Sequence, residues 1–408
     1  MRAGPAGASR VRSWPTAAVA LLAACGRLGY DPLPAGAEDG GADSAGPPLD
    51  AVGDGDAAPA TDGPAPWIVS VTRITANDGY SLVDLAVDWP RRLAYASSRQ
   101  ADECLLIVDF GDERAPARIA DLAPGQPYAT AGVTCLGVAL WDGGRRLVLS
   151  SQSSSGVEAW DLGADPRTLS FLRTAVAASD RPCRLRVRDD GVGGALVAWA
   201  RGGAGGGGAF ETATISPAGQ IGNRKAWADA CSNNYVVALA GQVAGGCWED
   251  LSPISVLDEA TFGTTATIDM SAPGPTGLWS GAVDPGGRWS FHGGWVSAFV
   301  DHATSPPSLL SRFDNDEVYR AATALSDGGG TTLYTVTAGG RVVEVWDATD
   351  PGAPRLVRRA DLPGTEGETY GVSVDPGSRR AAVVTNAGDF VLIDLSAIPA
   401  TTIVWPRF

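Results

Sequence analysis

One pattern of strands and turns recurs along most of this chain. Each copy has an apolar strand, a tight turn rich in Gly, Pro and Asp, a second strand, and a third strand that usually closes on Asp. The clearest copy runs from residues 371–374 through the turn at 375–379 to 381–384 and 390–394. Seven third strands end at positions 109, 161, 215, 258, 301, 347 and 394. Their mean spacing is about 48 residues, a period that is typical of repeat architectures.

The turns between the first two strands of each copy have the chemistry of hairpins. Asp-Gly and Asp-Pro-Gly segments, as at Asp142, Asp284 and Asp375, supply the positive or pre-set φ angles that short hairpins need. No segment shows the 3.6-residue periodicity of an amphipathic helix. The sequence therefore predicts an all-β fold, a seven-bladed β-propeller, with six or eight blades as alternatives. A β-sandwich gives no reason for such a period, and the coils of a β-helix are shorter.

A fourth, outer strand follows the third strand in most copies, at residues 117–122, 169–174, 308–313 and 355–362. Two segments near the ends of the domain, 68–74 and 401–405, also have the composition of outer strands. An open ring of blades would leave strand edges exposed to pairing with other chains. We therefore expect the segment 68–74 to complete the last blade and to close the ring.

Several third strands carry recognisable repeat motifs. Residues 105–109 read Leu-Leu-Ile-Val-Asp and residues 391–394 read Val-Leu-Ile-Asp. These segments resemble the LVIVD and YVTN repeats of propellers in bacterial surface proteins. The pairs Trp160-Asp161 and Trp346-Asp347 are similar to the ending of a WD repeat, although the Gly-His partner of that motif is missing. The resemblance covers nearly the whole body of the chain and implies blade architecture, but it indicates almost nothing about activity.

The first 25 residues have the features of an export signal. Three arginines between residues 2 and 12 precede an apolar run at 17–24, which is too short to span a membrane. The run ends Leu-Ala-Ala-Cys at Cys25, and this segment resembles the lipobox of bacterial lipoproteins. The resemblance implies a signal peptide at 1–24, cleavage before Cys25 and acylation of Cys25, with palmitate among the acyl chains. An ordinary signal peptide that is cut nearby is the alternative.

Residues 25–66 form a tether between this anchor and the body of the protein, which we place at 67–408. The tether consists mainly of Gly, Ala, Pro and Asp. It has too few bulky apolar side chains to offset its ordering entropy, so we expect it to be disordered. The whole chain is acidic, with a formal net charge of −15. This charge argues against nucleic acid as a partner and against direct adsorption to anionic headgroups. The lipid anchor is therefore expected to attach the protein to the membrane.

Polar and aromatic residues gather at or near the starts of the inner strands. Loops at one face of a propeller are the usual place for binding, so we predict that these residues form a ligand face. The candidates are Tyr80, Arg184, Asn233, Asn234, Trp279, Tyr319, Arg320, Glu368 and Tyr370. Packing between blades is the alternative explanation for aromatic side chains at strand ends.

The five cysteines of the body recur at related positions. Cys135, Cys183 and Cys231 are evenly spaced, about one repeat apart, and each precedes an inner strand. Cys104 and Cys247 lie near the connection between a second and a third strand. Because export permits disulfides, we predict the pairs Cys104–Cys135 and Cys231–Cys247, with Cys183 left free. A zinc or copper thiolate site is the alternative.

Few residues of this sequence suit catalysis. The chain has two histidines, His292 and His302, so a three-histidine metal centre is excluded. His292 lies in a Gly-rich segment, where we expect a turn. Residues 203–208 fit G-x-G-x-x-G, but a strand follows them and not the helix that a dinucleotide site requires. We therefore expect no cofactor, no metal and no catalytic residue.

Together these patterns predict a lipid-anchored, monomeric propeller in the outer membrane or at the cell surface, which binds a protein or a glycan through its blade loops. An enzyme is the alternative, namely a lactonase- or glycosidase-like hydrolase with its site over the central channel. YVTN-like propellers resemble lactonases in fold. A cluster of His302, Arg320 and acidic residues over the channel would favour the enzyme, and scattered positions would favour the binding protein.

Overall fold

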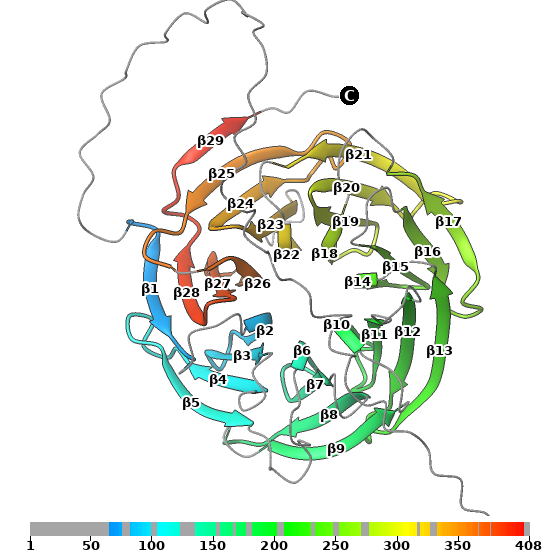
Figure 1. Ribbon diagram of the computed structural model, residues 1–408, viewed down its shortest axis with the longest axis horizontal. Coiled ribbons are helices and arrows are strands. Elements are labelled where there is room, and N and C mark those ends of the chain that lie inside the picture. The colour runs from blue at the N-terminus through cyan, green and yellow to red at the C-terminus, as the bar shows by residue number, and fades with distance from the viewer. Residues whose placement is uncertain are drawn as a thin grey trace, which may run out of the picture.

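The computed structural model describes residues 65–75, 82–98, 104–122, 135–151, 156–165, 169–176, 182–201, 208–229, 233–247, 253–270, 277–315, 319–326, 333–365, 367–375 and 377–403. The predicted signal, Cys25 and most of the tether lie outside these ranges. The described residues form strands and turns, and no helix among them is long and apolar enough to cross a membrane. Their strands build seven sheets that stand around a ring (Figure 1). The predicted all-β propeller is therefore confirmed.

The first three blades each contain four consecutive antiparallel strands. Blade 1 consists of β2 (Leu82–Asp88), β3 (Leu93–Ser98), β4 (Leu105–Asp109) and β5 (Ala117–Leu122). Blade 2 consists of β6 (Cys135–Trp141), β7 (Arg146–Ser151), β8 (Gly156–Leu162) and β9 (Leu169–Val176). Blade 3 consists of β10 (Pro182–Asp189), β11 (Ala195–Arg201), β12 (Gly208–Ile215) and β13 (Ile221–Asp229).

The next three blades repeat this arrangement. Blade 4 consists of β14 (Asn233–Leu239), β15 (Gln242–Cys247), β16 (Ile254–Asp258) and β17 (Thr264–Ile268). Blade 5 consists of β18 (Leu278–Val283), β19 (Trp289–Gly294), β20 (Val296–Asp301) and β21 (Ser308–Asp314). Blade 6 begins with β22 (Tyr319–Ser326), β23 (Leu333–Gly339), β24 (Val342–Asp347) and β25 (Arg355–Asp361).

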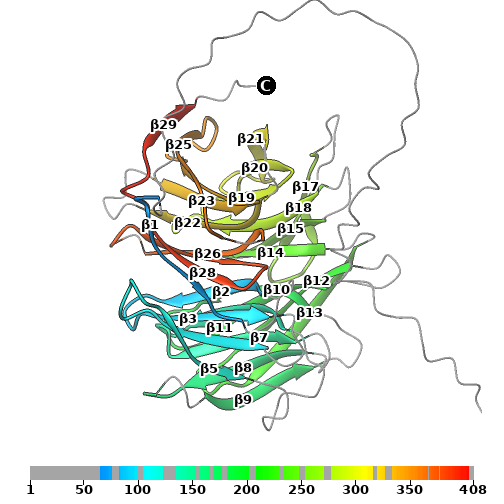
Figure 2. The ribbon, with the colours of Figure 1, turned by 60° about the vertical axis from the view of Figure 1, so that its left-hand side comes forward.

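The two ends of the domain complete the last two blades. Blade 7 consists of β26 (Thr369–Asp375), β27 (Arg380–Thr385), β28 (Asp389–Asp394) and the N-terminal β1 (Ile68–Arg73). Strand β1 pairs antiparallel with β28, and Figure 2 shows the two strands side by side. The C-terminal β29 (Ala400–Ile403) adds a fifth strand to blade 6 along β25. The expected closure of the ring by the N-terminal segment is thus observed.

The apolar core is divided into seven clusters, and each cluster lies between two neighbouring blades. Tyr95 and Ile107 of blade 1, for example, pack with Leu147 and Trp160 of blade 2. Burial of apolar surface is worth about 25 cal/mol per Å², so every blade is held by both of its neighbours. The same kind of cluster joins blade 7 to blade 1, which seals the ring where the chain begins and ends.

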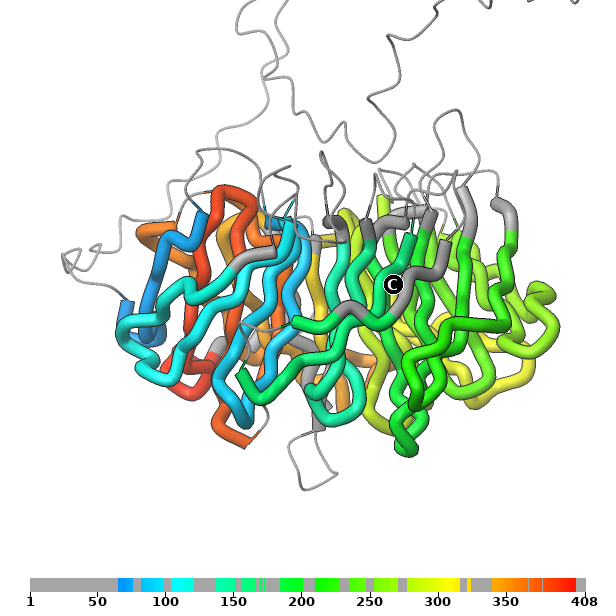
Figure 3. The backbone as a smooth tube through the Cα atoms, turned by 90° about the horizontal axis from the view of Figure 1, so that it is seen from below, coloured from blue at the N-terminus to red at the C-terminus, as the bar shows by residue number. Residues whose placement is uncertain are grey.

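The strands run between the two faces of the ring (Figure 3). We call the face at which the seven inner strands begin the entry face, and the opposite face, which carries the hairpins to the second strands, the turn face. The inner strands are β2, β6, β10, β14, β18, β22 and β26, and each is the terminal strand of its sheet. Their free edges surround a central channel (Figure 1).

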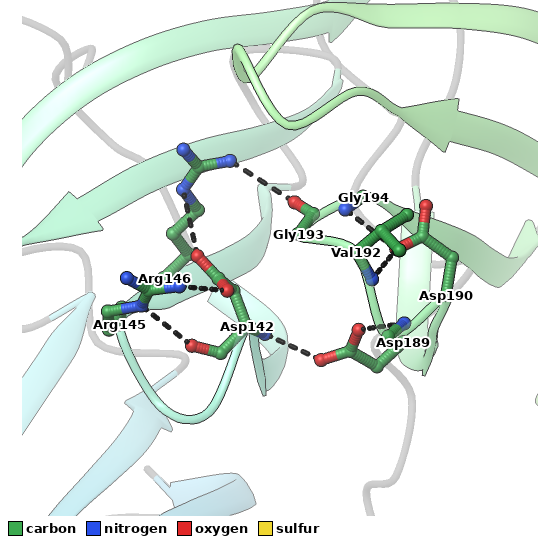
Figure 4. A network of polar contacts seen from close by, with 9 residues as sticks. Asp142, Arg145, Arg146, Asp189, Asp190, Val192, Gly193 and Gly194 are labelled. Atoms are coloured by element: carbon green, nitrogen blue, oxygen red, sulfur yellow. Dashed lines mark hydrogen bonds and ion pairs between the residues drawn. The ribbon is translucent and has the colours of Figure 1, made fainter.

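Polar contacts tie neighbouring hairpins together on the turn face. The backbone N–H of Asp142 in blade 2 donates to Oδ2 of Asp189 in blade 3 at 2.8 Å. Arg146 pairs with the Asp142 carboxylate at 3.7 Å, and its Nη1 donates to the carbonyl of Gly193 at 3.4 Å (Figure 4). The acidic turns that the repeat pattern contains are therefore engaged in holding the turn face of blades 2 and 3.

Candidate functional site at the mouth of the central channel

Every inner strand contains a β-bulge near its start. In blade 5, Leu278 pairs with Gly294 and Ser280 pairs with Gly293, so that Trp279 is the extra residue. The same shift of one residue occurs at the beginning of all seven inner strands. A bulge bends the strand and re-aims the side chain of the extra residue, and bulges are frequent beside functional sites.

The extra residues form a ring around the entry-face end of the channel, which we call the mouth. They are Val83, Leu136, Arg184, Asn234, Trp279, Arg320 and Tyr370 in blades 1 to 7. In blade 3 the shift spans Cys183 and Arg184. Five of the seven were predicted as ligand-face residues. Val83 and Tyr370 are buried, whereas Arg184 and Trp279 are half-buried.

Arg184 joins three blades at the mouth. Its Nη1 donates a hydrogen bond to the backbone carbonyl of Trp279 at 2.7 Å. Its guanidinium carbon also lies 5.8 Å from the centroid of the Tyr370 ring, within the range of a cation–π contact. Residues from blades 3, 5 and 7 are therefore brought together, although Arg184 and Trp279 are 95 positions apart in the sequence.

A second polar contact crosses the channel below the mouth. Arg186 in β10 pairs through Nη1 with Oδ2 of Asp84 in β2 at 3.2 Å. Asp84 is 5% exposed, and its oxygens also accept the backbone N–H groups of Leu85 at 3.0 Å and of Val138 at 3.4 Å. This ion pair was not predicted. A signal for it exists in the sequence, because arginines alternate at 184, 186 and 188 along an inner strand.

Two cavities lie in the channel, with volumes of about 200 and 260 Å³. Both are lined by Arg186, Val187, Ala322 and Thr323. Most of the remaining lining residues are small and apolar, and they come from the inner strands of blades 1, 2, 4, 5, 6 and 7. Among the described lining residues of these two cavities, one arginine and one aspartate lie within walls that are otherwise mainly aliphatic.

The other predicted ligand-face residues are only partly described. Glu368 is half-buried beside Asn386, whose Oδ1 accepts the Glu368 N–H at 2.8 Å and whose N–H donates to the Glu368 carbonyl at 2.8 Å. Tyr80 lies outside the described residues. The backbone places Asn233, Asn234, Tyr319 and Arg320 at the entry-face ends of β14 and β22, but their side chains lie outside the described part of the chain.

The cysteine predictions are tested at one position. Cys104 is 3% exposed and is disulfide-bonded. The side chains of Cys135, Cys183, Cys231 and Cys247 lie outside the described part, so the proposed pairing of Cys104 with Cys135 and of Cys231 with Cys247 stays a prediction. Within the described ranges, no group of three or more His, Cys, Asp or Glu side chains could hold a metal ion.

A chain of hydrogen bonds runs between blades 4 and 5. The Tyr235 hydroxyl lies 2.6 Å from Nδ1 of His292, and Ser290 Oγ lies 2.6 Å from Nε2 of His292. Ser290 Oγ also lies 2.7 Å from Nε2 of His302, whose Nδ1 lies 2.6 Å from Oε1 of Gln242. The Gln242 oxygen can only accept, so His302 donates to it through Nδ1 and accepts from Ser290 at Nε2. Ser290 in turn accepts from Nε2 of His292, and Nδ1 of His292 accepts from the Tyr235 hydroxyl.

This direction requires that both imidazoles are neutral. Burial, together with the nearby His302, lowers the pKa of His292 to about 3. Burial also lowers the pKa of His302 to about 4, although Asp301 opposes that effect. The expectation that His292 lies in a turn is wrong, because this residue is fully buried within β19.

His302 and Arg320, whose clustering would favour the enzyme alternative, lie on different faces of the ring. The N–H of His302 donates to the carbonyl of Arg288 in the hairpin between β18 and β19, so His302 lies near the turn face. Arg320 is at the start of β22, on the entry face. The backbone thus places these two residues at opposite ends of their strands, so they do not meet over the channel.

One comparison with known proteins supports the propeller fold. No family model matches the chain, and no curated protein matches its sequence. Among solved structures, a chain of a crystal structure of the mitotic checkpoint complex is similar, with a TM-score of 0.59 and 11% sequence identity over 86% of this chain and 99% of that chain. At this identity the likeness shows the propeller fold alone. The resemblance to LVIVD and YVTN repeats stays a prediction.

Proposed function

We propose that this chain is an exported, lipid-anchored β-propeller that binds a protein partner at the mouth of its channel. The observation that carries this proposal is the convergence of Arg184, Trp279 and Tyr370 from three blades. Trp, Tyr and Arg are the residue types that dominate the binding energy of protein interfaces. Here they are presented by bulges, so their positions are fixed by paired backbone and not by flexible loops.

A second tryptophan extends this surface on blade 5. Trp295 lies in the tight connection between β19 and β20 on the entry face, and 37% of it is exposed. Its backbone N–H donates to the carbonyl of Gly277 at 3.0 Å, directly before the strand that carries Trp279. A protein partner could therefore contact two tryptophans and an arginine without a change in the fold of blade 5.

The anchor belongs to the same proposal. Acylation of Cys25 would hold the protein at a membrane, since two or more acyl chains give stable binding. Residues 25–66 would then separate the propeller from the lipid surface. We place the protein in the outer membrane or at the cell surface as a monomer, where the mouth is free to meet other envelope proteins.

An affinity experiment with matched variants tests the binding surface. Residues 67–408 are immobilised and exposed to a detergent extract of the host cell envelope, and the bound proteins are quantified by mass spectrometry. A partner should be captured by the wild type and by the turn-face control Arg145→Ala. Trp279→Ala and Arg184→Ala should each reduce capture roughly 30-fold, the effect of an interface hot spot. Equal capture by all four proteins would contradict the proposal, provided that their melting temperatures agree.

A further inference from the structure

Arg186 is the feature of the channel that the proposed function does not use. Arg186 lines both cavities, and 27% of its side chain is exposed. Within the described residues, its hydrogen bonds all involve Nη1, which donates to Asp84 at 3.2 Å and to the carbonyl of Leu185 at 2.8 Å. An arginine carries five N–H donors on three nitrogens. Those on Nε and Nη2 are therefore left for a molecule in the channel.

The charges along β10 favour an anion at this point. Arg184 lies at the mouth and Arg186 lies two residues deeper, about 7 Å further along the strand. Arg188 follows at the turn-face end, where Glu259 binds it through both oxygens at 2.7 and 2.9 Å. The protein as a whole is acidic, so these arginines make the channel a local exception. An anion that enters from the mouth would pass Arg184 before it reaches Arg186.

The walls of the channel define the rest of the ligand. Besides Arg186 and Asp84, the larger cavity is lined by Val, Ala and Leu residues together with Thr323 and Ser373. Each cavity is larger than the roughly 150 Å³ in which benzene binds. The inner strands also have no strand partner on the channel side, so their edge N–H groups are further donors for an oxyanion.

We infer that the central channel binds a small organic monocarboxylate with an apolar body, and that the guanidinium of Arg186 anchors the carboxylate. A planar carboxylate matches the paired N–H groups of Nε and Nη2, because arginine binds such groups through two parallel hydrogen bonds. The apolar body lies against the aliphatic walls. Asp84, which holds Nη1 of the same guanidinium, repels the ligand's carboxylate because both groups are negatively charged. This site lies inside the channel and does not depend on a protein partner at the mouth.

The probe for this site is 4-bromobenzoate, and its uncharged analogue 4-bromobenzamide is the control ligand. Crystals of residues 67–408 soaked with 4-bromobenzoate should show the anomalous signal of bromine inside the channel, with the carboxylate on Arg186. Calorimetric titration in solution should give binding of the benzoate and at least tenfold weaker binding of the benzamide. A bromine position outside the channel, or equal affinities for the two compounds, would overturn the inference.

Three variants separate ligand binding from a structural role of Arg186. Arg186→Gln should weaken benzoate binding roughly 10- to 100-fold, because a charged hydrogen bond is lost. Arg186→Lys provides the same test if the glutamine variant does not fold, since lysine cannot make the two-pronged contact. Asp84→Asn should instead tighten binding several-fold, because it removes a negative charge beside the bound carboxylate.

The opposite signs at Arg186 and Asp84 are the decisive result. Arg145→Gln is the matched control, because it makes the same chemical change at an exposed turn-face arginine and should leave the affinity unchanged. If Arg186→Gln and Arg145→Gln bind 4-bromobenzoate as the wild type does, or if Asp84→Asn weakens binding as much as Arg186→Gln does, the assignment of the site to Arg186 is wrong.

Discussion

The carboxylate of Asp84 in β2 lies 3.2 Å from Nη1 of Arg186 in β10, although the whole of blade 2 separates those strands in the sequence. The same carboxylate accepts the N–H of Val138 in β6. One buried side chain thus joins the inner strands of three consecutive blades. Asp84 follows the bulge of its strand, and the equivalent positions in β6 and β26 are Gly137 and Gly371.

Removal of this carboxylate should destabilise the ring. We expect Asp84→Ala to lower the free energy of unfolding by about 1–3 kcal/mol, because it leaves Arg186 and two backbone N–H groups without their acceptor. Urea unfolding followed by circular dichroism measures the change. Asp109→Ala is the control: this aspartate is exposed, its carboxylate accepts the N–H of Gly111, and its loss should cost less than about 1 kcal/mol. Equal losses in both variants would contradict the account.

Gly137 should resist substitution because the neighbouring blade approaches it closely. A Cβ atom at this position would lie 2.7 Å from the backbone nitrogen of Leu185 and 3.1 Å from Cα of Arg184. Backbone atoms cannot move aside as a flexible side chain can, so Gly137→Ala should lower stability by about 1–3 kcal/mol. Gly222→Ala, where no atom lies within 4 Å, should stay within about 0.5 kcal/mol of the wild type in the same unfolding assay. If Gly137→Ala were as stable as the wild type, blades 2 and 3 would be further apart than described.

The two buried histidines should make the protein sensitive to mild acid. Their pKa values are about 3 and 4 in the folded state, against about 6.5 in an unfolded chain. The unfolded state therefore takes up protons first as the pH falls through 6.5. Stability should be nearly constant between about pH 7 and pH 9 and should decrease by roughly 1–3 kcal/mol per unit between pH 6 and pH 4.5. Urea unfolding at a series of pH values measures this loss.

Nuclear magnetic resonance of the imidazole rings gives an independent check of the same prediction. The chain has two histidines, so two ring signals are expected from the folded protein. Neither should titrate above about pH 5, given the pKa values of the folded state. The variant His302→Gln should retain roughly half of the acid-induced loss in stability. An imidazole that titrates near pH 6.5 in the native protein would show that the chain of hydrogen bonds between blades 4 and 5 is not formed.

Much of the fold could be predicted from the sequence because its information is local. The segments 105–109 and 117–122 coincide with β4 and β5, since their ends are marked by Asp and Gly turns. Two outer strands, β13 and β17, were not predicted. Strand β17, with the sequence Thr-Thr-Ala-Thr-Ile, is mostly exposed and lacks an apolar run. Outer strands contribute little to the core, so their composition resembles that of a loop.

The site could be predicted only in part, because its contacts depend on the closed ring. Trp279 and Tyr370 were selected by their position at inner-strand starts, but their contacts with Arg184 require the bulges and the crossing of the channel. His292 was misjudged for a related reason. The glycine that follows it, Gly293, indicated a turn, whereas a Cβ there would lie 2.8 Å from the ring of Phe291. This glycine serves close packing within a strand.

The lipid anchor leads to a prediction about the full-length protein. Cys25→Ala removes the thiol that acylation requires, so the variant should move from the membrane fraction to the soluble fraction of the host envelope. Cys183→Ala, which changes a cysteine of the propeller, should leave the fractionation unchanged. The measurement is quantitative blotting of both fractions. A Cys25→Ala protein that stays with the membrane would contradict the anchor.

The most direct test of the central claim, that the mouth binds a protein partner, is photo-crosslinking in the intact host cell. The photoreactive residue p-benzoylphenylalanine replaces Trp279 in one full-length protein and Arg145, on the turn face, in another. After irradiation, we expect a discrete protein adduct from position 279 and none from position 145. The account would be contradicted if position 279 gave no adduct, or if position 145 alone gave one. It would also be contradicted if the species crosslinked at position 279 were not a protein, which would be seen as an adduct whose added mass resists protease digestion.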